Sequence, residues 1–432
     1  MAQVAGKHVS PGDHVVLGLS GGLDSVVLLH LLRELSSRQG FILSCLHVNH
    51  SISPNASLWV KFCEDLCKKL EVPLSVENVD ISPHLSSGIE AAARIARYAA
   101  FGNMKAHYIA LAQHRDDQAE TVLLQLFRGA GPKGLAAMGE STPFRDKFIL
   151  RPLLSVARRT LEAFAQEKNL EWVCDESNAD IRFDRNFVRH NLMPVIEQRF
   201  PSCRETISRA GGHFSEAAGL LDELAAIDAS GAVIGGRLSV ARLQGLSEAR
   251  AKNLLRHYLC ANNIRMPGAE RLGEMLKQFS SARQDAHISI RHEGFDFRCF
   301  RGFVHIVKPL PIAAGFFREW HGEPRMHIAE LGGDLVFETG AGGIDAQKLT
   351  EPVTIRVREG GERFRPYSDR PVRRLKNLFQ ENGIPPWQRD SLPLLYCGEH
   401  LIWVSGIGLD PEYRADKGLV PRWEICDIDG KA

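Results

Sequence analysis

The chain has 432 residues, of which 44% are hydrophobic, and this length allows two to four domains that each bury a core. Its net charge of +1 excludes a strongly basic protein that coats nucleic acid, but it leaves room for a local basic surface. The nine cysteines are scattered and form no C-x-x-C pair, which favours free thiols in a reducing compartment over a disulfide framework, a zinc ribbon or a redox pair. Residues 1–13 hold no apolar signal segment, and no run approaches membrane-spanning length, so we expect a soluble, cytoplasmic protein without membrane contact.

The most informative segment lies near the N-terminus, between an apolar strand predicted at 14–17 and an apolar helix predicted to continue through 26–32. Its residues are Ser20, Gly21, Gly22, Leu23, Asp24 and Ser25. Glycine permits a positive φ and leaves no side chain between the backbone and a ligand. The serine and aspartate oxygens lie where the helix still has unpaired N–H groups. The segment therefore predicts a binding site for a phosphate.

This glycine turn is not the common P-loop, because the chain contains no G-x-x-x-x-G-K-[ST]. It resembles the S-G-G-x-D-S pyrophosphate loop of the N-type ATP pyrophosphatases. The resemblance implies that ATP is cleaved between its α- and β-phosphates and that an oxygen of the substrate is adenylated. The alternative is an ordinary glycine-rich turn. It is disfavoured because a strand, serine, two glycines, aspartate, serine and a helix follow one another in the expected order.

Strands and helices alternate up to residue 112, with strands predicted at 14–17, 41–48, 73–79 and 108–112 and helices at 55–70 and 89–107. This alternation predicts an α/β fold with a doubly wound parallel sheet, in which ligands bind beyond the carboxyl ends of the strands. Polar segments follow three of the predicted strands, at 20–25, 47–50 and 113–117. We therefore expect these three segments to meet in one crevice.

The third polar segment opens a helix and carries two adjacent carboxylates, Asp116 and Asp117. Mg²⁺ prefers oxygen ligands and often shares them with phosphate, so we predict that Asp24 and Asp117 hold this ion. An aspartate at the start of a helix is also a good cap without any metal, and the sequence does not separate Asp116 from Asp117 in either role.

Six further motifs occur in order between Val15 and Pro194. They are His47-Val-Asn-His50, Ile89-Glu-Ala-Ala-Ala-Arg94-Ile-Ala-Arg97-Tyr98, His114-x-Asp116-Asp117-x-x-Glu120-Thr121, Arg128-Gly-x-Gly-x-x-Gly134-Leu135, Arg151-Pro-Leu-Leu154 and Asp175-x-Ser177-Asn178. In this combination the chain is similar to the tRNA(Ile)-lysidine synthetase family. One departure is Ser51, where the family more often has glycine followed by Leu-Arg, so we expect this loop to differ in shape.

The resemblance implies a two-step reaction on the wobble cytidine of the CAU anticodon of tRNA(Ile), with ATP and Mg²⁺ as cofactors. The C2 carbonyl oxygen attacks the α-phosphate, pyrophosphate leaves, and the ε-amine of free L-lysine displaces AMP. The lysidine product changes codon specificity from AUG to AUA and amino-acid identity from Met to Ile. The lysine amine must first lose a proton, and His114 and its neighbouring carboxylates are the candidate bases.

The predicted site residues follow from this resemblance and from the positions at strand ends. We predict catalytic roles for Asp24, Arg94, His114 and Asp117, ATP contacts from Ser20, Gly21, Gly22, Leu23, Asp24, Ser25 and His47, and RNA contacts from Arg128 and Arg189. Residues 129–134 formally match G-x-G-x-x-G, but they follow a helix instead of a strand, which excludes a nicotinamide site. The polar stretch 175–189 is either a solvated face or, as the resemblance implies, the rim of the active site.

The catalytic domain is predicted at 1–215, with a helical pattern from residue 204 leading out of it. Residues 216–312 predict a mainly helical, tRNA-facing domain that has short strands at 288–291 and 303–307. A helix from Ser247 to about Asn262 would bury Leu254, Leu255 and Leu259. A soluble helical unit without substrate contact is the alternative.

A third, small α+β domain is predicted at 345–432. Between Arg356 and Lys376 there are eight Lys or Arg and three Asp or Glu, a local basic excess in a balanced chain. Such a segment suits contacts with RNA phosphates, and it resembles the C-terminal domain of the same family. We predict RNA contacts from Arg358, Arg363, Arg373, Arg374 and Lys376.

Other functional classes stay open at this point. A PP-loop tRNA thiolase, or another adenylating tRNA-modifying enzyme, shares the phosphate loop, but thiolases of that group typically need paired cysteines. An amidotransferase-type synthetase needs a glutaminase domain, for which the residues before Ser20 leave no room, and a binding protein would keep the fold without the chemistry. The sequence identifies no residues for the lysine substrate, and a homodimer is compatible with it.

Overall fold

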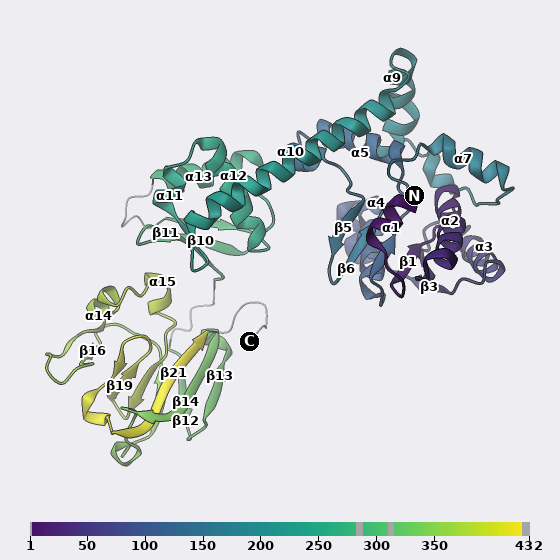
Figure 1. Cartoon of the computed structure of the whole chain (residues 1–432). Coiled ribbons are helices and arrows are strands. Elements are labelled where there is room, and N and C mark those ends of the chain that lie inside the picture. Colours follow the sequence, from purple (N-terminus) through teal and green to yellow (C-terminus); the bar gives the residue numbers. More distant parts are fainter. Residues whose placement is uncertain (1, 282–287, 310–314, 426–432) are drawn as a thin grey trace. The chain divides into compact units, whose positions relative to one another are not determined.

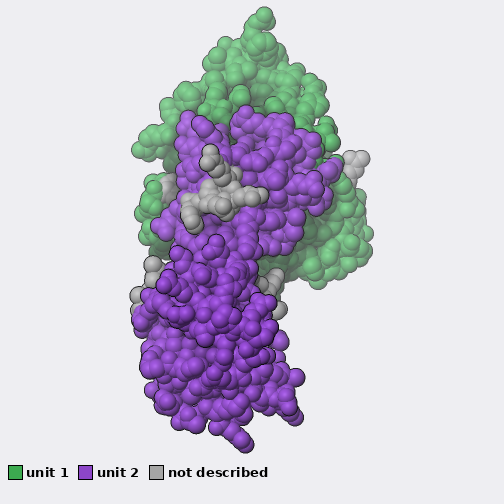
Figure 2. Space-filling view, turned by 90° about the vertical axis from the view of Figure 1, so that its left-hand side faces the viewer, with its two compact units in different colours: residues 1–224 green, residues 225–432 purple. Residues whose placement is uncertain are grey.

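The computed structural model describes residues 2–281, 288–309 and 315–425. The chain divides into two compact units, Met1–Leu224 and Ala225–Ala432, which Figure 2 colours separately. Residues 310–312 of the predicted middle domain and residues 426–432 of the predicted C-terminal domain lie outside the described ranges. Within those ranges, no helix combines the length and the apolar character that crossing a membrane requires.

The first unit is built on a six-stranded sheet with the order β3-β2-β1-β4-β6-β5 (Figure 1). Its strands are β1 (His14–Gly18), β2 (Ile42–Asn49), β3 (Leu74–Asn78), β4 (Tyr108–Ala110), β5 (Ser141–Phe144) and β6 (Lys147–Leu150). All neighbouring strands pair in parallel except β5, which pairs antiparallel with β6 at one edge. The predicted doubly wound α/β fold is confirmed.

Side-chain alternation along β1 explains why both faces of this sheet are covered. Val15 and Leu17 are buried in a cluster with residues of α2 (Leu23–Gln39), α3 (Ala56–Lys69) and α7 (Arg158–Glu167). Val16 belongs to a second cluster with Phe101 of α4 (Ile89–Asn103). A strand buried on both faces is apolar along its buried positions, as Val15, Val16 and Leu17 of β1 are. The helix α4 ends four residues before the predicted His107, because Met104 is already extended.

From residue 115 to residue 232 the chain outside β5 and β6 is mostly helical. It forms α5 (Arg115–Phe127), α6 (Pro132–Leu135), α8 (Asp184–Phe187), the helical turn η3 (Val188–Leu192), α9 (Met193–Arg199) and the long helix α10 (Cys203–Ala232). Helix α10 runs through the predicted domain boundary at residue 215 and through the boundary between the two compact units. The boundary therefore falls inside a continuous helix, where neither composition nor a turn marks it.

The next part of the chain combines helices with a sheet. Helices α11 (Val240–Gln244), α12 (Glu248–Ala261) and α13 (Ala269–Ser281) accompany strands β7 (Val233–Ile234), β8 (Arg237–Ser239), β9 (Ser289–His292), β10 (Phe295–Phe300) and β11 (Phe303–Val307). The predicted burial of Leu254, Leu255 and Leu259 is confirmed. The sequence predicted only two strands here, which correspond to β9 and β11. The structure instead has a sheet of five strands in the order β7-β8-β11-β10-β9. Strands β7 and β8 have only two and three residues, too few for a periodic pattern.

The last part of the chain has two principal sheets, β12-β15-β18-β19-β20 and β13-β14-β21, and the β16-β17 pair (Figure 1). Its elements are β12 (Phe317–Trp320), β13 (Arg325–Ile328), β14 (Gly333–Ala341), β15 (Val353–Arg356), β16 (Arg363–Phe364), β17 (Arg373–Arg374), α14 (Leu375–Glu381), α15 (Pro386–Arg389), β18 (Leu394–Cys397), β19 (His400–Val404), β20 (Gly408–Leu409), η6 (Pro411–Tyr413) and β21 (Lys417–Ile425). Strand β12 pairs with β15, and β14 pairs with β21 along nine residues. The predicted boundary at residue 345 lies between β14 and β15, so β12, β13 and β14 precede it although they belong to sheets with strands that follow it.

Candidate active site

The glycine turn follows β1 as predicted, and Gly21 has a φ of +82°. A Cβ atom at this position would lie 2.9 Å from Val173 Cγ2 and 3.3 Å from Cys63 Sγ. The carbonyl of Gly21 also accepts a hydrogen bond from the Val173 N–H at 3.0 Å. Both its backbone conformation and its surroundings therefore require glycine.

The start of α2 is left open to an anion. Gly22 is the N-cap residue, and no side chain caps the first N–H groups of the helix. Ser25 Oγ donates instead to the Gly22 carbonyl at 2.9 Å and lies 3.1 Å from Ser20 Oγ. Unpaired N–H groups beside two hydroxyls suit a phosphate, for which the sequence predicts a site at this turn.

His47 lies at the carboxyl end of β2, beside the same turn. Its Nδ1 is 2.9 Å from the Leu19 carbonyl, so Nδ1 carries the proton and donates it to that oxygen. Burial lowers the pKa of His47 below its usual value, and the hydrogen bond to Leu19 only partly opposes this effect. His47 is therefore a neutral imidazole that supports the turn on one side and presents Nε2 on the other.

His114 and Asp24 come together from two different strand ends. His114 Nε2 lies 3.6 Å from Asp24 Oδ2 and 3.4 Å from Asp117 Oδ2. His114 Nδ1 accepts a hydrogen bond from the Asp117 N–H, which leaves the ring proton on Nε2, facing the carboxylates. Burial alone would lower the pKa of His114, but the hydrogen bond to Asp24 and the charge of Asp117 outweigh it, and the pKa is raised.

Asp24 has one oxygen to spare. Its Oδ1 is buried and has no hydrogen-bond partner within the described chain. An orphaned carboxylate oxygen is costly unless a cation or a donor from a ligand satisfies it. Together with the neighbouring phosphate site, this oxygen fits a Mg²⁺ ion, whose preferred ligands are carboxylate and phosphate oxygens.

Asp117 offers no such oxygen, which differs from its predicted role as a metal ligand. Its Oδ1 lies 3.0 Å from both Arg185 and Arg189, and its Oδ2 accepts from the His114 N–H at 3.0 Å. Burial would raise the pKa of Asp117, but His114 and the two arginines outweigh it, and the pKa is lowered. Asp117 is thus an ionised carboxylate that is already fully coordinated by protein groups.

The same two arginines hold Glu120, whose side chain is 1% exposed. Arg189 Nε lies 2.7 Å from Glu120 Oε1, and Arg185 Nε lies 3.0 Å from Glu120 Oε2. Arg189 is therefore part of a buried ion-pair network, which we call the Asp117–Glu120 network, and its contact with RNA stays a prediction. The arginines are more than 60 residues away from Asp117 and Glu120 in the sequence, so no local pattern predicts these ion pairs.

The adjacent Asp116 has a different, structural environment. Its Oδ1 accepts from the Arg158 N–H at the start of α7, and its Oδ2 lies 3.3 Å from Arg204 NH1 of α10. The structure thereby separates two carboxylates that the sequence left equivalent. Asp117 lies beside His114, and Asp116 connects α5 to two other helices.

The remaining predicted residues of the first unit lie on its surface. Arg94 is exposed on α4, where its guanidinium lies 5.0 Å from the centre of the Tyr98 ring. Arg128, at the end of α5, is also exposed and lies 3.6 Å from Asp184 Oδ2. Leu126 and Phe127 beside it are exposed apolar side chains.

The predicted RNA residues of the C-terminal domain divide into two groups. Arg358 and Arg373 lie near acidic partners, Asp390 at 3.8 Å and Glu381 at 2.7 Å. Arg363, Arg374 and Lys376 are exposed, and no carboxylate pairs with them within the described residues. Arg363 faces Arg374 across the β16-β17 pair, so their like charges are held side by side.

Comparison with known proteins agrees with this geometry. Residues 2–196 match the model of the PP-loop domain, residues 238–305 that of the TilS substrate binding domain, and residues 353–424 that of the TilS substrate C-terminal domain. The tRNA(Ile)-lysidine synthase of Nitrosomonas europaea is 43% identical over 98% of this chain and 94% of that protein. The enzyme of Azoarcus sp. (strain BH72) is 36% identical over 96% of this chain and 92% of that protein. The enzyme of Enterobacter sp. (strain 638) is 37% identical over 98% of this chain and 99% of that protein. From its glycine turn to its C-terminal sheets, the chain belongs to the tRNA(Ile)-lysidine synthase family.

Proposed function

We propose that this protein uses ATP to join free L-lysine to C2 of the wobble cytidine of tRNA(Ile) with a CAU anticodon, giving lysidine, AMP and pyrophosphate. The observation that carries the proposal is the meeting of Asp24 and His114 beside the glycine turn, in a chain whose relatives are lysidine synthases along their length. A tRNA thiolase is not favoured, because the curated relatives are lysidine synthases.

The glycine turn would bind the departing diphosphate. Backbone N–H groups at the start of α2 and the hydroxyls of Ser20 and Ser25 are donors that need not reorganise as charge develops on the leaving group. Asp24 Oδ1 would hold Mg²⁺ next to them. When bound, this ion neutralises phosphate charge and stabilises the leaving diphosphate.

His114 would act chiefly by positioning Asp24. Both of its ring nitrogens are engaged, Nδ1 by the Asp117 N–H and Nε2 by the carboxylates, so it has no free lone pair for a lysine ammonium. Asp24 Oδ1 is the unpartnered acceptor at this place, and it could take the amine proton once the diphosphate has left. Arg94 remains a proposed catalytic residue that would reach the substrate from α4.

Recognition of tRNA would involve the exposed basic residues. Arg128 lies at the end of α5, and Arg363, Arg374 and Lys376 form an exposed group that we call the β16–α14 basic patch. Such residues suit phosphate contacts, and the target base must leave its stack to reach the active site. We place the activity in the cytoplasm, where tRNA, ATP and lysine meet, and a homodimer remains a prediction.

A pyrophosphate-release assay tests the proposal. Purified protein is supplied with ATP and Mg²⁺, with and without lysine and a tRNA(Ile) transcript that has a CAU anticodon. We expect multiple-turnover formation of pyrophosphate and AMP in equal amounts, and lysine in the RNA product, only when tRNA(Ile) and lysine are both present. Without lysine, at most one pyrophosphate per tRNA should be released, because AMP then stays on the cytidine. Turnover of ATP to ADP, or sulfur transfer to the RNA in place of lysine incorporation, would contradict the proposal.

A further inference from the structure

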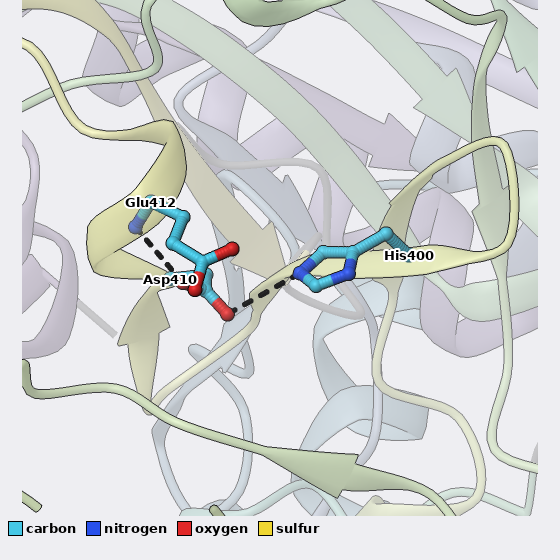
Figure 3. A group of neighbouring side chains, drawn as sticks. All are labelled: His400, Asp410 and Glu412. Atoms are coloured by element: carbon cyan, nitrogen blue, oxygen red, sulfur yellow. Dashed lines mark hydrogen bonds and ion pairs between the residues drawn. The ribbon is translucent and has the colours of Figure 1, made fainter.

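A cluster of metal-ligating side chains lies in the C-terminal domain, apart from the residues of the proposed reaction. His400 begins β19, and Asp410 and Glu412 lie at the start of η6. One ligand atom from each of these residues lies within 4.8 Å of the other two. Figure 3 shows the imidazole of His400 facing the carboxylate of Asp410, with the carboxylate of Glu412 beside it. We call these three residues the His400 cluster.

One distance within the cluster matches the separation of two ligands around one small ion. His400 Nε2 lies 3.4 Å from Asp410 Oδ2. A tetrahedral Zn²⁺ with bonds of about 2.0–2.1 Å holds neighbouring ligand atoms about 3.3 Å apart. The imidazole and one carboxylate are therefore already at the separation that a shared Zn²⁺ would impose.

Each carboxylate has one oxygen held by the protein and a second oxygen directed elsewhere. Asp410 Oδ1 accepts from the Glu412 N–H at 2.9 Å, which leaves Oδ2 facing His400. Glu412 Oε1 pairs with Arg365, which leaves Oε2 for another ligand. The ring of His400 lies against Tyr413, with their centres 5.2 Å apart. Outer contacts of this kind orient metal ligands in proteins.

A cavity beside the cluster supplies room for a further ligand. It has a volume of about 260 Å³, and its lining includes His400, Asp410, Arg363 and Arg365. The Asp410 side chain is only 8% exposed, while those of His400 and Glu412 are 47% and 63% exposed, so the site would bind its ion at the surface with one buried ligand. A buried carboxylate beside a second carboxylate gains from a cation, and the cavity leaves a coordination position open to water or an anion.

We propose that His400, Asp410 and Glu412 bind one Zn²⁺ ion, which ties β19 to η6. An imidazole with two carboxylates is a ligand set suited to Zn²⁺, while Mg²⁺ and Ca²⁺ prefer oxygen ligands alone. The site is separate from the Mg²⁺ that Asp24 would hold. Its basic neighbours Arg363 and Arg365 would place an anion in the cavity next to the metal.

The experiment measures Zn²⁺ binding to the full chain after treatment with a chelator. Exposed Cys174 and Cys260 are first replaced by serine, so that their thiols do not compete for the metal. We expect one equivalent of Zn²⁺ to bind in competition with a chromogenic chelator, and Co²⁺ to give the visible absorption of a tetrahedral site. The affinity should fall at least tenfold in His400→Ala and in Glu412→Gln, which keeps the size of the side chain.

A matched control uses a second histidine–aspartate pair of the same domain. His327 Nδ1 lies 2.5 Å from Asp334 Oδ1, but this pair is not part of a three-ligand cluster within the described chain. His327→Ala should therefore bind Zn²⁺ as the parent protein does. The absence of stoichiometric binding in the parent protein, or equal binding in His400→Ala, would overturn the proposal. Neither measurement needs tRNA, so failure here is distinct from failure of lysidine formation.

Discussion

The Asp117–Glu120 network and the C-terminal basic segment both join arginines to carboxylates, but they do so in opposite environments. Glu120 is 1% exposed and is held by two arginines, whereas Glu399, the partner of Arg356, is 89% exposed. A buried pair depends strongly on each partner, because removing one leaves an uncompensated charge. An exposed pair is worth at most about 1 kcal/mol, so the fold depends little on either partner. The first arrangement suits a rigid site, and the second suits an adaptable surface.

The largest expected effect comes from the one carboxylate of the rigid site that is not fully coordinated. Asp24→Asn keeps the size of the side chain but removes the charge facing His114 and any bound cation. We expect lysidine formation to fall by about 10²–10³-fold, the scale seen when a group that stabilises developing charge is lost. The measurement is AMP formed per minute at saturating tRNA and lysine. Activity within threefold of the parent protein would show that Asp24 belongs to the fold alone.

The next effect separates the two kinds of ion pair directly. Glu120→Gln leaves Arg185 and Arg189 with one carboxylate to share, and we expect a loss of about 3 kcal/mol in the free energy of unfolding. The matched control is Glu399→Gln, for which the change should stay within about 1 kcal/mol. Urea unfolding followed by circular dichroism measures both. Equal losses in the two variants would remove the distinction between the regions.

The surface half of the comparison is tested by tRNA binding. The triple variant Arg363→Ala, Arg374→Ala and Lys376→Ala removes the β16–α14 basic patch, and we expect tRNA affinity to fall about tenfold or more. The slope of log affinity against log salt should become shallower by up to about 3, roughly one for each lost phosphate contact. Arg356→Gln is the control, because Arg356 is occupied by Glu399 and by the Tyr396 ring. An unchanged slope in the triple variant would place the RNA contacts elsewhere.

The smallest effect concerns pH. The pKa of His114 is raised in the folded protein, so its charged form stabilises the fold fully below the usual value of about 6.5. This contribution is lost as the pH rises through the folded pKa. The loss of stability in His114→Gln should therefore be greater at pH 6 than at pH 8.5. The exposed His213→Gln is the control and should show no such trend, and a loss in His114→Gln that grows with pH would contradict the assignment.

The comparison also shows which features the sequence reveals. The glycine turn, the first four strands of the first unit and the positions of the three segments at the strand ends are encoded by neighbouring residues, and the structure confirms them, whereas β5 and β6 were not predicted. The roles of Asp117 and Arg189 depend on pairing across more than 60 residues, which no local pattern carries. The sheet of the middle domain was predicted only in part, because β7 and β8 are too short to show a period, although β10 does alternate apolar and polar residues. Short strands such as β8 and β12 are stabilised by pairing with β11 and β15, and a local sequence pattern does not show this pairing.

The clamp of Val173 on Gly21 has a consequence for the order in which substrates bind. The Val173 N–H donates to the Gly21 carbonyl, and its Cγ2 atom occupies the place that a side chain at residue 21 would need. The polypeptide that continues from Val173 soon reaches Arg185 and Arg189. Nucleotide that settles in the turn would therefore stiffen the segment that carries these arginines before the anticodon arrives. An enzyme built in this way should take up ATP first and hold its RNA more tightly once the nucleotide is in place.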